Sequence, residues 1–242
     1  RVAQGDLGRS IISNKSVMEE LTDTVGPTAE LMVGAMVLAV PLGLVLGTLA
    51  AVKRGGLLDR FIVALSVAGV SMPVFFVGLI LMLYAGYKWD LLPFTGRTGP
   101  VWDGGLAALV LPSLTLCSVL VGPIARITRT AVLEVLGADF VRTARAKGLK
   151  ERVVIVHPAL RNALIPVVTL VGLQAAFQLG GAVVTETMFS WPGVGRLAVG
   201  AIVSSDFPTA QGAIMILALA FLFINLIVDV LYVVLDPRVQ RA

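Results

Sequence analysis

Few side chains in this sequence are of a type that does catalytic or metal chemistry. There is one Cys (Cys117) and one His (His157), too few for a His/Cys metal cluster. The sequence contains no GxxxxGK[ST] nucleotide loop, no HExxH zinc motif and no GxSxG nucleophile elbow. We therefore expect no catalytic residue, no metal site and no cofactor on this chain.

Two pairs of polar residues fall within long apolar stretches. Gln174 and Gln178 are four residues apart, as are Asn225 and Asp229, so each pair lies on one face of a helix. An acid deep in an apolar helix is costly unless it faces a partner or water. Both pairs could form hydrogen bonds with a neighbouring helix or line a polar passage, and the sequence leaves these alternatives open.

The composition indicates whether the helices that carry these residues lie in water or in a lipid bilayer. Hydrophobic residues make up 57% of the chain, not counting 25 Gly, and charged residues only 14%. Soluble domains have about 25% charged residues. A soluble globule of 242 residues could not bury this much apolar surface. The composition predicts an all-α, polytopic membrane protein and argues against a disordered, disulfide-rich or nucleic-acid-binding chain.

Five stretches are long enough to cross a bilayer, which takes about 20 residues. They are residues 27–52, 61–87, 106–124 with a more polar continuation to 136, 163–184, and 212–235. Pro and Gly occur inside them, for example Gly69, Pro73 and Gly78 in the second. Such residues permit kinks and close helix contacts in membranes.

The basic residues assign the two sides of the membrane. Thirteen of the 19 Lys and Arg follow the first span, separate the third from the fourth, or lie in the tail. The positive-inside rule places these segments in the cytoplasm. Nine acidic residues, including Glu186 and Asp206, lie on the other side. We thus expect residues 1–25 outside, a membrane domain over 26–235 with a cytoplasmic loop at about 134–160, and a cytoplasmic tail at 236–242. A chain that starts outside must have crossed first, so we expect one further N-terminal helix and six spans.

The loop from Glu134 to Pro166 is the most distinctive segment. Its length and charge predict short amphipathic helices on the cytoplasmic face, broken at Gly148. Charge alone fits a solvated loop equally well.

Four separated stretches, in order along the chain, resemble one family. They are Gly5–Ser10; Arg142–Leu149 with His157, Ala159–Leu164 and Pro166; Glu186–Gly195; and Asn225, Asp229, Tyr232 and Asp236–Arg238. Together they are similar to permease subunits of bacterial ABC importers, in the dipeptide, oligopeptide and nickel branch. The resemblance covers essentially the whole chain.

The resemblance implies a type I ABC importer transmembrane domain in the bacterial cytoplasmic (inner) membrane. Its coupling helix, which docks on an ATP-hydrolysing subunit, would comprise Asp139, Phe140, Arg142, Thr143, Ala144, Arg145, Ala146, Lys147, Gly148 and Leu149. The wider family opens this motif with Glu-Ala-Ala, whereas this chain has Arg142-Thr143-Ala144. The pairing with a particular ATPase residue therefore stays open.

The implied partners are a similar but non-identical second permease, two ATP-binding subunits that hold ATP and Mg, an external substrate-binding protein and the lipid bilayer, with no nucleic acid. Dipeptides or oligopeptides are the expected substrates, with nickel or glutathione as alternatives. An ion-driven secondary transporter is the alternative from another class. It would require more than one intramembrane charge, and Asp229 is the single one found.

Overall fold

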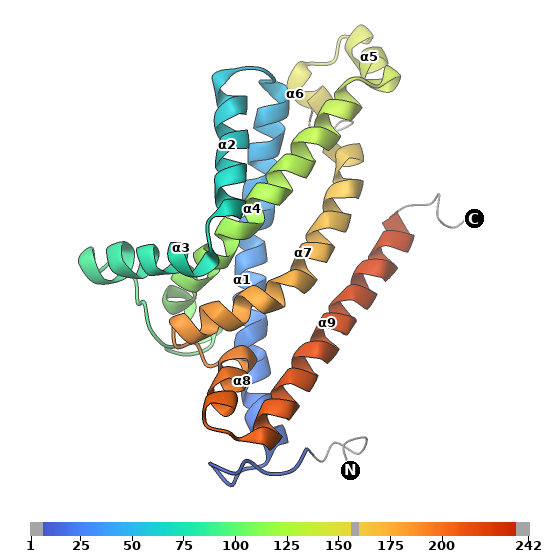
Figure 1. The fold of residues 1–242 in the computed structure, drawn as a ribbon. Coiled ribbons are helices and arrows are strands. Elements are labelled where there is room, and N and C mark those ends of the chain that lie inside the picture. Colours follow the sequence, from blue (N-terminus) through green and yellow to red (C-terminus); the bar gives the residue numbers. More distant parts are fainter. Residues whose placement is uncertain (1–6, 156–159, 236–242) are drawn as a thin grey trace. The chain divides into compact units, whose positions relative to one another are not determined.

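The computed structural model describes residues 7–155 and 160–235 (Figure 1). Within these ranges every regular element is helical, apart from one isolated β-bridge between Arg9 and Ser16. The elements are α1 (Val17–Val52), α2 (Leu57–Ser71), α3 (Val74–Leu81), the π-helical η2 (Met82–Lys88), the 3-10 turn η3 (Val101–Asp103), α4 (Leu106–Leu136), α5 (Asp139–Ala146), α6 (Glu151–Val154), α7 (Leu160–Met188), α8 (Val194–Val203) and α9 (Phe207–Leu235). His157, the Gly5–Asp6 pair and the tail from Asp236 lie outside the described residues.

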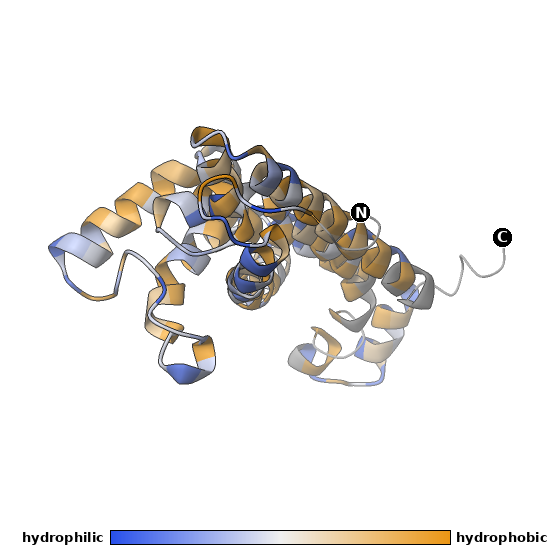
Figure 2. Cartoon of the chain, turned by 90° about the horizontal axis from the view of Figure 1, so that it is seen from below, coloured by the Kyte–Doolittle hydropathy of each residue, from blue (hydrophilic) through white to orange (hydrophobic). Residues whose placement is uncertain are grey.

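Four described helices, α1, α4, α7 and α9, are long and apolar enough to cross a membrane. They confirm four of the five expected spans. Hydrophobic residues run along these helices and hydrophilic ones gather in the connections (Figure 2). α1 begins at Val17, well before the predicted Pro27, because Val17 and Leu21 are buried in a cluster with Val194, Ala198 and Ala213.

The remaining expected span, residues 61–87, is present in two pieces. α2 ends at Ser71, and Met72 and Pro73 are extended, with ψ of 129° and 135°. Proline disfavours helical backbone at the residue before it and has no N–H for the helix ladder. Counting α2 with α3 and η2 as one broken span gives five spans in the described chain.

The chain divides into two compact units. The first contains residues up to 37, 73–117 and 175–224, and the second contains 38–72, 118–174 and 225 onward. α1, α4, α7 and α9 each contribute to both units.

Glycines bring helix backbones together in the second unit. A Cβ on Gly47 would collide with the backbone of α4 at Ala125 and Arg129, and one on Gly122 would collide with the backbone at Ser66 in α2. Small residues allow such close approach, which membrane helices use because lipid supplies no hydrophobic drive between them.

A partly buried ion pair adds to this packing. Arg129 on α4 donates two hydrogen bonds to the Asp59 carboxylate, at 2.6 and 2.8 Å, and the Gly55 N–H donates a third at 2.9 Å. The pair joins the start of α2 to α4. The sequence placed Arg129 only among the basic residues of the cytoplasmic side and gave no partner for it.

Two acidic residues expected among the external charges are instead buried in the first unit. Glu186 lies in the last turn of α7 with no exposed surface. Its carboxylate accepts hydrogen bonds from Thr28 Oγ1 at 2.6 Å and from the Arg196 N–H at 3.1 Å. It thereby caps the N-terminus of α8 and ties it to α1. Gly193 must be glycine here, because a Cβ would overlap this carboxylate.

Asp206, between α8 and α9, is the second buried acid. It accepts hydrogen bonds from Ser10 Oγ at 2.5 Å, the Ile11 N–H at 3.1 Å and Thr209 Oγ1 at 2.9 Å. Burial raises the pKa of this carboxyl, but the hydrogen bonds outweigh burial and hold the pKa below its ordinary value of 3.8. Asp206 thus fastens the segment before α1 to the start of α9.

We expect Gly47→Val to lower the free energy of unfolding by roughly 1–3 kcal/mol, the usual cost of overpacking. The side chain would meet α4 backbone, which cannot move aside. Gly26→Val, also on α1, is the control because its Cβ would have nothing within 4 Å. Thermal unfolding in detergent measures both, and equal effects would contradict the packing described here.

We expect Asp206→Asn to lower the free energy of unfolding at neutral pH by roughly 1–3 kcal/mol, as for hydrogen bonds to a charged group. Because folding lowers the pKa of Asp206, its ionised form stabilises the fold above pH 3.8, and this contribution disappears as the pH falls through the lower folded value. The difference between wild type and variant should therefore shrink on acidification. Asp23→Asn, at an exposed position on α1, is the control. A difference independent of pH would exclude an ionised Asp206.

Candidate functional site

The expected coupling segment folds as two short helices around a turn. α5 begins at Asp139, directly after α4 ends at Leu136, so only Gly137 and Ala138 separate them. Hydrogen bonds from the Gly137 and Ala138 N–H groups to Glu134 and Val135 carbonyls keep this connection tight. α5 and α6 lie beyond the ends of α4 and α7 (Figure 1). The segment is therefore joined to α4 by a short, hydrogen-bonded connection.

Gly148 forms the turn between the two helices. Its φ is +75°, in the left-handed region that glycine adopts without steric cost. The Gly148 N–H donates to the Arg145 carbonyl at 2.9 Å, which closes the end of α5. A Cβ at Gly148 would meet nothing within 4 Å. Glycine is therefore favoured here by the backbone conformation and not by a lack of room for a side chain.

An ion pair holds α5 and α6 together across this turn. Arg145 donates two hydrogen bonds to the Glu151 carboxylate, at 2.7 and 3.1 Å. The Arg145 hydrogen bond lowers the pKa of Glu151 and raises that of Arg145. Both groups are solvent-exposed, so the pair orients the helices more than it stabilises them.

The segment has a buried side and an exposed side. Val141 on α5 and Val154 on α6 are fully buried. Phe140 and Leu149 are each 46% exposed, and Arg142, Lys147 and Lys150 are exposed beside them. Of these exposed residues, an aromatic such as Phe140 and an arginine such as Arg142 are of the types enriched in protein-binding surfaces.

All ten predicted coupling residues therefore lie on one compact helix–turn–helix. The helices and the break at Gly148 were predicted from the sequence. Sequence analysis did not foresee the Arg145–Glu151 pair or the burial of Val141. The contact of the ten predicted coupling residues with an ATPase stays a prediction.

The predicted polar pairs have different surroundings. On α7, Gln178 is buried and neither amide atom has a hydrogen-bond partner among the described residues, whereas Gln174 is half-buried. On α9, Asn225 is half-buried and has an interaction partner, whereas Asp229, one turn on, is exposed. The roles proposed from the sequence for these four residues stay open.

The described residues, 7–155 and 160–235, hold no group of three or more His, Cys, Asp or Glu side chains that could bind a metal ion. The acids that sequence analysis did not recognise as structural, Asp59, Glu186 and Asp206, each accept hydrogen bonds from within the fold. The sequence showed only that each of these acids lies beside a long apolar stretch, and it did not indicate which group each acid binds.

A family model described as "Binding-protein-dependent transport system inner membrane component" matches residues 43–241. The chain is 42% identical to the dipeptide transport system permease protein DppB of Escherichia coli (strain K12), over 99% of this chain and 78% of that protein. It is 41% identical to the di/tripeptide transport system permease protein DppB of Pseudomonas aeruginosa, with the same coverage. Its identity to the glutathione transport system permease protein GsiC of Pectobacterium atrosepticum is also 41%, over 99% of this chain and 76% of that protein.

Solved structures agree on the fold. A chain of the MetNI methionine ABC transporter in an inward-facing conformation matches with a TM-score of 0.73 at 18% identity, over 90% of this chain and 97% of that one. A chain of an amino acid ABC transporter matches with a TM-score of 0.65 at 13% identity, over 88% of this chain and 93% of that one. The expected type I ABC importer fold is confirmed. The chain belongs to the family of inner-membrane components of binding-protein-dependent transport systems, and it is a multi-pass permease subunit of an ABC importer.

Proposed function

We propose that this permease imports short peptides, most directly dipeptides and tripeptides, driven by ATP hydrolysis on partner subunits. The substrates in the names of its relatives support this proposal, since dipeptides, tripeptides and glutathione all belong to one chemical class. Glutathione is itself a tripeptide, so the glutathione permeases widen the substrate range without changing its chemistry.

The α5–α6 segment is the proposed point of energy coupling. Its exposed Phe140 and Leu149 would enter a groove on an ATP-binding subunit, while the buried Val141 and Val154 hold it to its own chain. The two-residue link to α4 and the Arg145–Glu151 pair would let the segment move together with α4. Each permease would contact one of two ATP-binding subunits, and these would hold ATP and Mg.

The transport cycle follows from this arrangement. ATP binding closes the pair of ATPase subunits, and the coupling segments of the two permeases follow them. The passage between the permeases then changes from inward-open to outward-open and receives peptide from an external binding protein. No covalent step on this chain is needed, so its residues act by packing and position.

The remaining partner is a similar, non-identical second permease. α9 supplies a surface for it, because Leu222, Phe223 and Leu226 are exposed and Asp229 lies close by in the sequence on the same helix. In the proposed topology, residues 1–25 face outward, residues 134–160 and 236–242 face the cytoplasm, and the rest of 26–235 forms the membrane domain.

We expect the complete complex in proteoliposomes to accumulate radiolabelled alanyl-alanine only when ATP and the binding protein are both present. Glutathione and free alanine are compared under the same conditions, and free alanine should not be taken up. Uptake of a nickel complex with no uptake of either peptide would refute the peptide assignment.

We expect Gly148→Val to reduce peptide transported per ATP hydrolysed, because a β-branched residue with positive φ costs at least about 1–2 kcal/mol and would distort the turn. Gly148→Asn should keep most of the coupling, since Asn tolerates this backbone region. Gly55→Val is the matched control, because Gly55 has a φ of +78° in the turn between α1 and α2.

Transport and ATP hydrolysis are measured on the same proteoliposomes. If Gly55→Val uncouples as strongly as Gly148→Val, the effect is general strain and the assignment of α5–α6 fails.

A further inference from the structure

We propose that a groove in the first compact unit is a binding site for the charged termini of a short peptide on its way into the importer. The inference rests on the proposed peptide substrate. It adds a place on this chain, at the face expected to lie outside, where that substrate binds. The groove has a volume of about 390 Å³. Small-molecule sites commonly measure 300–1,000 Å³, so this one suits a ligand of a few residues.

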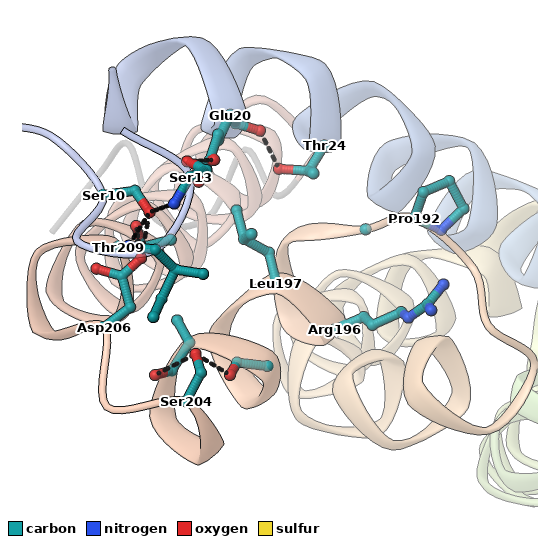
Figure 3. A pocket seen from close by; sticks show the side chains of 14 residues that line it. Ser10, Ser13, Glu20, Thr24, Pro192, Arg196, Leu197, Ser204, Asp206 and Thr209 are labelled. Atoms are coloured by element: carbon teal, nitrogen blue, oxygen red, sulfur yellow. Dashed lines mark hydrogen bonds between the residues drawn. The ribbon is translucent and has the colours of Figure 1, made fainter. Parts of the chain in front are cut away.

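The groove lies between α1 with the segment before it and α8 with its flanking loops (Figure 3). Glu20 and Thr24 come from α1, and Arg196 and Leu197 come from α8. The remaining lining residues are Ser10, Ile12, Ser13, Pro192, Gly193, Gly200, Ala201, Ser204, Asp206 and Thr209.

The walls are fixed before any ligand arrives. Asp206 binds Ser10 on one wall, and Ser10 Oγ in turn accepts from the Ile12 and Ser13 N–H groups at 3.2 and 2.9 Å. Next to the lining residue Pro192, Trp191 Nε1 donates to the Pro27 carbonyl at 2.8 Å. Binding to a preformed site costs little free energy for ordering the protein.

Two charges of opposite sign remain available to a ligand. The half-buried Glu20 carboxylate accepts one side-chain hydrogen bond, from Ser13 Oγ at 2.5 Å. The exposed Arg196 guanidinium donates to the Ser190 carbonyl at 2.6 Å. Neither forms an ion pair within residues 7–155 and 160–235. A carboxylate has about four acceptor sites and a guanidinium five donors, so both have unused capacity.

The other polar groups of the groove are already committed. Asp206 is saturated by its own fold, and the first N–H groups of α8 bind Thr28 Oγ1 and the Glu186 carboxylate. The helix N-terminus is thus already compensated. The groups left for a ligand are therefore the Glu20 carboxylate and the Arg196 guanidinium, and Leu197, Gly200 and Ala201 add apolar lining. A zwitterionic peptide matches these groups, with its ammonium at Glu20, its carboxylate at Arg196 and its variable side chains over small residues.

Binding of radiolabelled alanyl-alanine to the complete complex in nanodiscs, without the binding protein, tests this site. We expect Arg196→Gln to weaken binding roughly tenfold or more, the effect of losing one charge-assisted contact. The wild-type protein should also bind the C-terminal amide of the peptide less well, whereas Arg196→Gln should bind acid and amide equally. Glu20→Gln should likewise lose its preference for a free over an acetylated amino terminus.

Matched variants separate local from general effects. Glu19→Gln, the neighbouring exposed glutamate on α1, and Arg9→Gln, an exposed arginine in the segment before it, should keep both preferences. Gly200→Met should block the groove without disturbing the fold, because its Cβ meets nothing within 4 Å.

Unchanged preferences in Arg196→Gln and Glu20→Gln, or unchanged binding in Gly200→Met, would overturn the inference, as would a lack of saturable binding by the wild-type complex. Reduced affinity for the binding protein with normal peptide binding would make the groove a protein-docking surface and would also overturn it. Peptide uptake by the wild-type complex is measured in parallel. Its absence indicates failure of the proposed function, whereas normal uptake with unaltered variants indicates failure of this inference alone.

Discussion

In lipid there is no hydrophobic driving force for packing one apolar helix against another, and this constraint determines which interactions hold the chain together. Its helices associate where backbones approach closely, as at Gly47 and Gly122, and where buried polar groups find partners. Asp59 with Arg129, Glu186 with Thr28 and Asp206 with Ser10 each join segments far apart in the sequence. Removing one partner would leave a buried charge unsatisfied, so these contacts specify which segments meet.

The residues that stabilise the fold differ from those proposed to bind the substrate or a partner subunit. Glycines at close helix contacts and acids that are hydrogen-bonded within the fold help to fix the structure, whereas other side chains are exposed or line a groove. Phe140 and Leu149 are exposed on the α5–α6 segment, and Glu20 and Arg196 line the groove beside α8. In the proposed function, this division lets the importer subunit bind a substrate at one place and receive a mechanical force at another.

The sequence predicted the class of fold and most of the spans because hydrophobicity and length are local properties. It also predicted the short helices α5 and α6 and the break between them at Gly148, because glycine and the charge pattern are visible in one short segment. The buried acids could not be predicted as such, since Thr28, which binds Glu186, and Ser10, which binds Asp206, each lie more than 150 residues away from the acid along the chain. The interruption at Met72 and Pro73 was missed because proline inside a membrane span permits either a kink or a break. α8 was missed because its ten residues are too short for a span and flank a loop motif.

We propose that an ATP-binding subunit contacts this chain at α5. A photoreactive amino acid in place of Phe140, with one at the more exposed Leu57 as the control, tests this contact in membrane vesicles containing the complete complex. Leu57 is 84% exposed at the start of α2. The expected result is a crosslink to an ATP-binding subunit from position 140, altered by ATP, and none from position 57. Crosslinks to lipid alone from position 140, in a complex that still hydrolyses ATP and transports peptide, would contradict the account.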